Sequence, residues 1–169
     1  MGNIEYQMKI KLVSYKFPNL SMRIDRKDYK VLAKHIWRPS PTKIGGFYAT
    51  TRIKKDGEYK TVYAHRMIMD QPKGMVVDHI NHNTLDNRRN NLRVCTQSQN
   101  AFNRGIQRQN TSGYKGVHYY RKKKKYCAYI DISRKRIHLG YFESAIEAAK
   151  KYNETALFFR GEYAYINNV

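Results

Sequence analysis

The sequence is poor in acidic residues, has two cysteines and contains no long apolar run. Of its 169 residues, 13 are Asp or Glu and 33 are Lys or Arg, so the formal net charge is +20. An excess of this size is typical of proteins that bind nucleic acid. The lack of a long apolar run argues against a membrane-spanning helix. The basic residues also do not lie on one amphipathic helix that could rest on a membrane surface.

The two cysteines, Cys95 and Cys127, are far apart and form no Cys-x-x-Cys pair. We therefore expect reduced thiols and no structural zinc. The N-terminus shows no basic region followed by an apolar stretch, which argues against a secretory signal. Together these absences predict a cytoplasmic protein that is not secreted.

Hydrophobic residues make up 41% of the chain and the mean hydropathy is −0.80, which favours small modules over one large core. Residues 1–64 are expected to be mainly β structure. Apolar alternation predicts a strand at 6–12, helical spacing predicts a helix at 25–36, and Asp56-Gly57 predicts a hairpin between strands at 47–54 and 58–65. Residues 103–112 are polar and are expected to be a linker.

Residues 113–168 predict a second unit of three short strands followed by a helix. In the last strand, Ile137, Leu139 and Tyr141 alternate with Arg136 and His138. The helix begins at the capping box Ser144-x-x-Glu147 and ends near Gly161. Its apolar stripe consists of Ile146, Ala149, Tyr152 (or Asn153), Ala156 and Phe159. The fold class of the whole chain is therefore expected to be α+β.

The spacing of four polar residues indicates a reaction. Asp78 and His79 are adjacent, Asn91 lies twelve residues after His79, and Asn100 lies nine residues after Asn91. Hydrolysis of a phosphodiester needs a base that deprotonates water, and it needs the negative charge of the transition state and of the leaving 3′ oxygen to be stabilised. A neutral imidazole can be the base, and a divalent metal ion can stabilise the charge.

The expected local structure suits this chemistry. Asp78 and His79 end a predicted strand, where neighbouring side chains point to opposite sides, so one can reach a metal while the other faces water. Asn91 precedes a second strand at 92–96, and its amide can tie the loop between the strands. Asn100 falls on a short helix and can return to the metal. Such oxygen ligands favour Mg²⁺ or Mn²⁺.

This segment resembles the HNH endonucleases with their ββα-metal fold, and more closely the homing-type enzymes of phages and bacteria. The matching residues are His65-Arg66, Asp78-His79, the stretch 85–93 and Asn100. By this resemblance His79 is the general base, Asp78 and Asn100 are the metal ligands, and Asn91 is structural. The last position is often His in the family, and Asn favours Mg²⁺ over Zn²⁺. The resemblance implies a bacterial or phage-infected cell, with the protein at the nucleoid.

Several neighbouring residues have more than one interpretation. His65, expected in the preceding strand, supports the site, contacts phosphate, or is a packed core histidine. Arg66 anchors the scissile phosphate or pairs with Asp70. Three further arginines are expected to contact phosphate, with a solvated basic face as the alternative: Arg88, Arg89 and Arg93.

The second unit resembles an AP2 DNA-binding domain. The resemblance rests on Ser112–Val117, Tyr126-x-Ala128-x-Ile130, residues 136–142, Glu147-Ala148-Ala149, Tyr152-Asn153, Leu157 and Gly161-x-x-Ala164-x-Ile166-Asn167. It implies a three-stranded sheet that lies in the major groove of double-stranded DNA and is backed by the helix. The residues that it implies to face the groove are Lys115, His118, Tyr120, Tyr129, Asp131, Arg136 and His138.

Basic residues outside that face are expected to contact phosphates, which carry no base sequence. The turn after the first strand is almost wholly basic, and its alternative is a solvated hairpin tip; its residues are Arg121, Lys122, Lys123, Lys124 and Lys125. Arg104 and Arg108 in the linker are expected to lie along a groove. His118, Tyr120 and His138 depart from the AP2 pattern, so the base specificity of that family does not carry over.

These expectations combine into a modular DNA endonuclease without a small-molecule cofactor. An HNH domain spans 1–102, with a β-rich segment at 1–64 and the ββα-metal core at 65–102, and an AP2-like domain at 113–169 follows the linker. The enzyme nicks one strand or cuts both, as a monomer or a dimer. The alternatives are a DNA-binding regulator with an inactive nuclease site and an RNA-binding basic protein.

Overall fold

The computed structural model describes residues 7–42 and 45–169. It has two compact units, Met1–Gln97 and Ser98–Val169. The first holds β1 (Gln7–Lys11), β2 (Ser21–Asp25), α1 (Arg26–Leu32), β3 (Arg38–Pro41), β4 (Phe47–Lys55), β5 (Glu58–Tyr63), α2 (Ala64–Ile68), β6 (Val76–His79), the short 3-10 helix η1 (Arg89–Asn91) and β7 (Leu92–Cys95). No helix of the described segments is long and apolar enough to cross a membrane.

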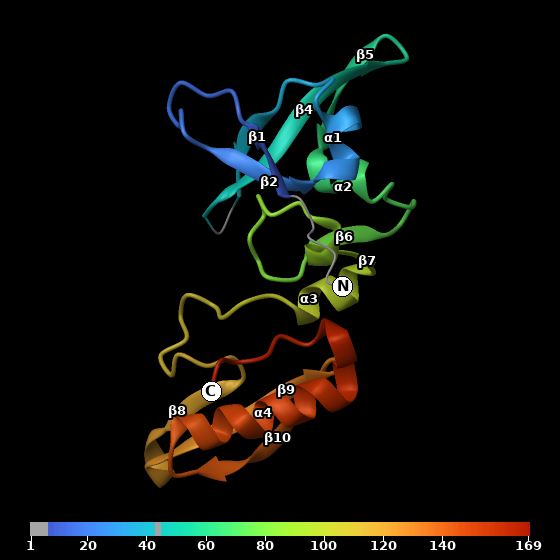
Figure 1. Ribbon diagram of the computed structural model, residues 1–169. Coiled ribbons are helices and arrows are strands. Elements are labelled where there is room, and N and C mark those ends of the chain that lie inside the picture. Colours follow the sequence, from blue (N-terminus) through green and yellow to red (C-terminus); the bar gives the residue numbers. More distant parts are fainter. Residues whose placement is uncertain (1–6, 43–44) are drawn as a thin grey trace, which may run out of the picture. The chain divides into compact units, whose positions relative to one another are not determined.

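The strands of the first unit form three small antiparallel sheets, β1–β2, β3–β4–β5 and β6–β7 (Figure 1). One apolar core joins them, and its largest buried side chain is Trp37. The Trp37 indole N–H donates to the carbonyl of Leu32 at 2.8 Å, so the polar atom of this buried ring is paired. Val77 of β6 and Leu92 of β7 belong to the same core, which fixes the ladder that carries Asp78 and His79.

The expected elements of this unit form with altered ends. The predicted strand at 6–12 is β1, although Tyr6 lies outside the described residues. Helix α1 ends at Leu32, four residues earlier than its spacing predicted. The expectation that His65 and Arg66 lie in a strand is wrong. Strand β5 ends at Tyr63, and helix α2 follows because its spacing buries Ala64 and Ile68 together.

The second unit holds α3 (Gln97–Phe102), which begins at the boundary, then β8 (Val117–Tyr120), η2 (Arg121–Lys123), β9 (Lys125–Ile132), β10 (Lys135–Phe142), α4 (Ala145–Arg160) and η3 (Gly161–Tyr163). The sheet order is β10–β9–β8, and α4 lies across one face (Figure 1). Both hydrogen bonds of the predicted capping box form at Ser144, and Gly161 is the C-cap.

Helix α4 buries the middle of its predicted apolar stripe, at Ala149, Tyr152 and Ala156, but not the two ends of the stripe. Its buried residues are Ala148, Ala149, Tyr152 and Ala156, whereas Ile146 and Phe159 are exposed. The alanines let the helix approach the sheet closely, and the bulk of the core comes from the strands, through residues such as Val117 and Ile130.

Candidate active site and nucleic-acid surface

Asp78 and His79 end β6, where the ladder with β7 pairs Asp78 with Arg93 and His79 with Leu92. All four side chains are buried. The Arg93 guanidinium donates to Oδ2 of Asp78 from Nε at 3.0 Å and from its terminal nitrogen at 2.7 Å. The buried carboxylate therefore has a buried cation beside it, as a charge in a core requires.

Nε2 of His79 lies 3.2 Å from Oδ1 of Asn87. Burial lowers the pKa of His79, although the hydrogen bond that its ring shares with the Asn87 oxygen and the nearby Asp78 partly oppose this. The imidazole is therefore neutral near pH 7. Because the Asn87 oxygen faces Nε2 and only accepts, this contact favours the tautomer with the proton on Nε2, in which Nδ1 is the basic nitrogen.

The His79 ring belongs to an aromatic cluster that also contains Tyr48, Tyr63 and His65. The ring centroid of His65 is 4.9 Å from that of His79, and the Tyr48 centroid is 5.3 Å from His65. Burial lowers the pKa of His65 to about 3, with smaller contributions from His79 and Arg66. Within the described part of the chain, Nδ1 of this buried ring has no hydrogen-bond partner.

The loop between β6 and β7 is closed by Asn91. Its Oδ1 accepts from the backbone N–H of Asn81 at 2.9 Å, and its Nδ2 donates to the carbonyl of Asp86 at 2.8 Å. The backbone N–H of Arg23 donates to the carbonyl of Leu85, and the backbone N–H of Asn87 donates to the carbonyl of Arg23. These two hydrogen bonds hold the same loop against β2. These contacts hold Asn87 at the Nε2 edge of the His79 ring.

The arginines that were expected to contact phosphate are engaged within the protein. Arg88 binds both oxygens of Asp86, and Arg89 binds Asp28 at 2.8 Å. Arg93 is buried against Asp78. Each of these three guanidiniums therefore has a carboxylate partner within the fold, and their contact with DNA phosphates stays a prediction. Arg66 stacks on Tyr63, with its guanidinium carbon 4.6 Å from the ring centroid, and its charge stays exposed.

A hard divalent cation suits the chemistry of the two predicted ligands. In the described segments, no three His, Cys, Asp or Glu side chains gather in a group that could hold a metal ion. Asp78 offers carboxylate oxygens, but its Oδ2 already accepts two hydrogen bonds from Arg93, so a metal ion would share or displace that partner. Asn100 lies on α3, within the second unit.

The outer face of the second sheet is the face away from α4. Tyr120 and Tyr141 pack at 5.5 Å between ring centroids, His138 and Tyr141 at 4.6 Å, and His118 and Tyr129 at 5.5 Å. The alternation of the strand predicted Tyr141 on the opposite face, and this prediction is wrong. A register shift between His138 and Gly140 returns Tyr141 to the outer face.

Cations border this outer face. Lys123 lies 4.0 Å from the Tyr141 ring centroid, and Arg136 lies 4.0 Å from that of Tyr129 while binding Asp131. The remaining basic residues of the η2 turn carry exposed or half-buried side chains: Arg121, Lys122, Lys124 and Lys125. Lys125 pairs with Glu143 at 2.7 Å.

Lys115 was expected on this outer face, but its ammonium group binds backbone carbonyls near the start of the predicted linker. Its Nζ donates to the carbonyls of Phe102 and Arg104 at 2.7 and 2.6 Å, and it lies 5.1 Å from the Tyr165 ring centroid. Burial lowers its pKa to about 8. Lys115 thus ties the start of the predicted linker to the second unit. The side chains of Arg104 and Arg108 are exposed.

Sequence reasoning gave no role to Asn87, Tyr48 or Tyr63. Asn87 belongs to the stretch 85–93 that supports the resemblance, so its place eight residues after His79 was a usable signal. Tyr48 and Tyr63 reach the site only through strand pairing and the turn into α2, which no local pattern reveals.

Comparison with known proteins agrees with this geometry. A family model described as HNH endonuclease matches residues 62–102. "Uncharacterized HNH endonuclease L560" of Acanthamoeba polyphaga mimivirus is 33% identical over 98 residues, which are 58% of this chain and 50% of that protein. "Protein 3.8" of Escherichia phage T7 is 41% identical over 46 residues, which are 27% of this chain and 38% of that protein. The chain thus spans half or less of each. No solved structure matches. Residues 62–102 form an HNH endonuclease domain.

Proposed function

We propose that this protein is a metal-dependent DNA endonuclease of the homing type, in which His79 is the general base. The observation that carries the proposal is the neutral, buried imidazole of His79, oriented by Asn87 and adjacent to the Asp78 carboxylate. The match of this segment to the HNH endonucleases supports the same reading.

In this mechanism Nδ1 of His79 takes a proton from the attacking water, while Nε2 stays bound to Asn87. Asn91 keeps the β6–β7 loop closed, which favours a fixed position for Asn87 beside the imidazole. Asp78 and Asn100 are the proposed ligands of Mg²⁺ or Mn²⁺. When bound, the metal ion supplies positive charge at the scissile phosphate and at the leaving oxygen.

The second unit is proposed to be the AP2-like reader of double-stranded DNA. The three-stranded sheet backed by α4 supports this, as do the cations that border the outer face. A compact nuclease site makes few base contacts, so a separate reader would supply the specificity. The proposed contacts are His118, Tyr120, Tyr129, Arg136, His138 and the basic η2 turn.

Two alternatives remain to be tested. A DNA-binding regulator with an inactive site would bind the target without cutting it. An RNA-binding protein would prefer structured RNA to duplex DNA at fixed salt, and competition between the two ligands distinguishes them.

The decisive experiment compares the wild-type protein with His79→Ala on supercoiled plasmid that carries candidate target DNA, with Mg²⁺ or with EDTA. Metal-dependent open circles that the variant does not produce support a nicking enzyme, and linear product indicates paired cuts. Substantial nicking by His79→Ala contradicts the general-base assignment. Tight target binding without cleavage favours the regulator.

A further inference from the structure

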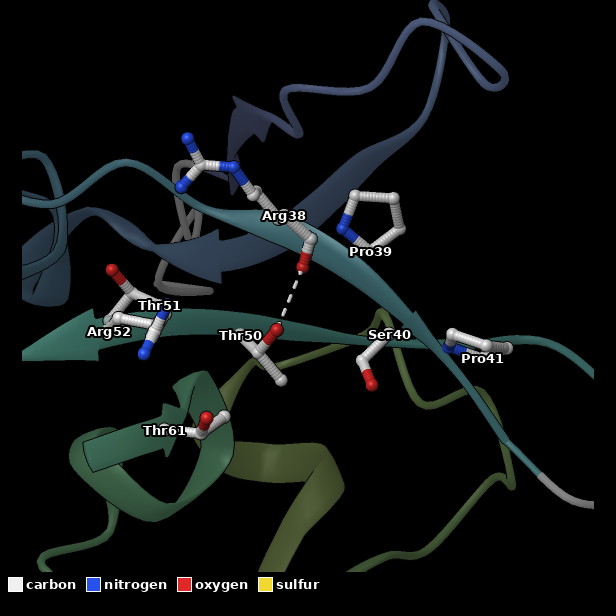
Figure 2. Close-up of a pocket in the computed structure, with 8 residues that line it drawn as sticks. All are labelled: Arg38, Pro39, Ser40, Pro41, Thr50, Thr51, Arg52 and Thr61. Carbon is white, nitrogen blue, oxygen red and sulfur yellow. Dashed lines mark hydrogen bonds between the residues drawn. The ribbon is translucent and has the colours of Figure 1, made fainter. Parts of the chain in front are cut away.

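An open pocket of about 540 Å³ lies on the sheet β3–β4–β5 in the first unit. Figure 2 shows that its lining residues come from all three neighbouring strands. Six of them have side chains that can bind an anion: Arg38, Ser40, Thr50, Thr51, Arg52 and Thr61.

Strand pairing sets this pocket next to the candidate active site. Residues directly opposite each other in an antiparallel ladder point to the same face, and so do residues two apart along a strand. Thr50 pairs with both Arg38 and Tyr63, and Arg52 pairs with Thr61. Arg38, Thr50, Arg52 and Thr61 therefore share a face with Tyr63. The ring centroid of Tyr63 is 5.5 Å from that of His65, which lies beside His79.

The pocket is positively charged and rich in hydroxyl groups. No acidic residue is among those that line it. In residues 7–42 and 45–169, neither Arg38 nor Arg52 forms an ion pair, and Arg52 packs 5.3 Å from the Tyr59 ring centroid. By contrast, Arg88, Arg89 and Arg93 each form an ion pair with an aspartate of the protein.

The strand edges around the pocket are held in place. The hydroxyl of Thr50 donates to the carbonyl of Arg38 at 3.2 Å, which joins β4 to β3 beside the pocket (Figure 2). Thr50 is buried, so this contact belongs to the floor of the pocket. Ser40 and Thr61 lie closer to solvent, where their hydroxyls can donate to a phosphate oxygen.

We propose that this pocket binds the phosphodiester backbone of DNA beside the cleaved bond, with Arg38 and Arg52 contacting phosphates and the hydroxyls of Ser40 and Thr61 assisting. The inference rests on the proposed nuclease function and deepens it. Arg52 and Thr61 lie two residues beyond the Thr50–Tyr63 pair, about 7 Å along the sheet. This is about two nucleotides of axial rise on one DNA strand. The pocket would thus hold the substrate in register without reading its sequence.

The test uses the full-length chain and a matched pair of double variants. Arg38→Gln with Arg52→Gln removes two charges from the pocket face. Lys55→Gln with Lys60→Gln removes two charges from the opposite face of the same sheet, because these lysines pair with Glu58 and Ile53. For each protein, binding to a short duplex is measured by fluorescence anisotropy between about 50 and 200 mM salt, and thermal unfolding is recorded.

For the pocket variant, the slope of log affinity against log salt concentration should be smaller in magnitude by about 1.8, because each lost phosphate contact removes about 0.9 from the slope. It should be unchanged for the control. Arg38→Lys with Arg52→Lys should restore the slope, which separates lost charge from lost fold. Equal slopes in the pocket variant and the wild-type protein would overturn the inference.

Two further outcomes separate this inference from the nuclease proposal and from a site for free anions. If the wild-type protein binds duplex DNA but does not nick it, the nuclease proposal fails and the slopes still decide the role of the pocket. If the pocket variant loses binding of inorganic phosphate measured at constant ionic strength while its salt slope for DNA equals that of the wild-type protein, the pocket is a site for free phosphate, and the backbone assignment is wrong.

Discussion

Oδ1 of Asn87 lies 3.2 Å from Nε2 of His79, and both side chains are buried. Asn87 is therefore a positioning residue that fixes the tautomer and the direction of the proposed base. We expect Asn87→Ala to lower kcat for nicking by about 10- to 100-fold, as loss of such a supporting contact does elsewhere. KM should change little, because the amide faces the imidazole and not the DNA.

The control for this variant is Asn90→Ala, an exposed amide of the same loop, which should nick like the wild-type protein. Thermal unfolding is measured for both variants. A loss of kcat that follows a loss of folded protein, or a rise in KM alone, would count against the positioning role.

The buried pair of Asp78 and Arg93 makes a second prediction, about stability. Arg93→Leu leaves the buried carboxylate without its guanidinium, and we expect the free energy of unfolding to fall by about 3–5 kcal/mol. Adding Asp78→Leu should recover a large part of this loss, because the double variant buries no charge. Denaturant unfolding of the three proteins measures the effect. Arg93→Leu alone with less than about 1 kcal/mol of loss would contradict it.

The sequence was most informative where a pattern is local. The capping box at Ser144, the strands of the second unit and the β6–β7 hairpin around Asp78 and His79 all form where alternation and spacing predicted them. Each depends on residues a few positions apart, so one sequence is enough to detect it.

The features that the sequence did not predict depend on tertiary contacts. Sequence indicates that Arg93 is basic, but only the register of β6 against β7 shows that it faces Asp78. The register shift before Gly140 moved Tyr141 to the other face, and the tie from Lys115 to Phe102 fixed the start of the predicted linker. These relationships join residues whose pairing no local spacing encodes.

His65 makes the stability of the first unit depend on pH. Its pKa is about 3 in the folded protein and near 6.5 when unfolded, so the unfolded chain binds more protons between these values. Stability is therefore lost as pH falls below about 6.5, by up to about 1.4 kcal/mol per pH unit for this one group. His65→Phe, which keeps a ring in the aromatic cluster, should flatten this dependence in denaturant unfolding measured from pH 7 toward pH 4. An unchanged slope would show that other groups cause it.

Gly116 has no room for a side chain. Its φ is +74°, and a Cβ there would lie 2.1 Å from the Tyr152 ring and 2.7 Å from the carbonyl oxygen of Tyr129. We expect Gly116→Ala to destabilise the second unit by roughly 2–4 kcal/mol through strain and overpacking. Gly113→Ala is the control, because its φ is +78° but no atom lies within 4 Å of the new Cβ. Thermal unfolding of both variants separates steric clash from backbone strain, and equal losses would contradict the packing argument.

Substitutions of Asp131 and of Arg136, which form an exposed ion pair, should have opposite effects on DNA binding. Both lie on the outer face of the second sheet, where the Asp131 carboxylate binds the Arg136 guanidinium at 2.9 Å. If DNA lies on this face, Arg136→Gln should weaken duplex binding and lower the salt slope by about 0.9. Asp131→Asn should tighten binding, because it removes a negative charge that repels phosphate and releases Arg136.

The control is Lys150→Gln on α4, which covers the other face of that sheet, and it should leave the slope unchanged. Anisotropy with a short duplex at several salt concentrations measures all three variants. The sign for Asp131→Asn is the informative result, since general damage to the fold weakens binding and cannot strengthen it. If Asp131→Asn binds DNA no more tightly than the wild-type protein while Lys150→Gln binds more weakly, the DNA contacts α4 and the sheet assignment is wrong.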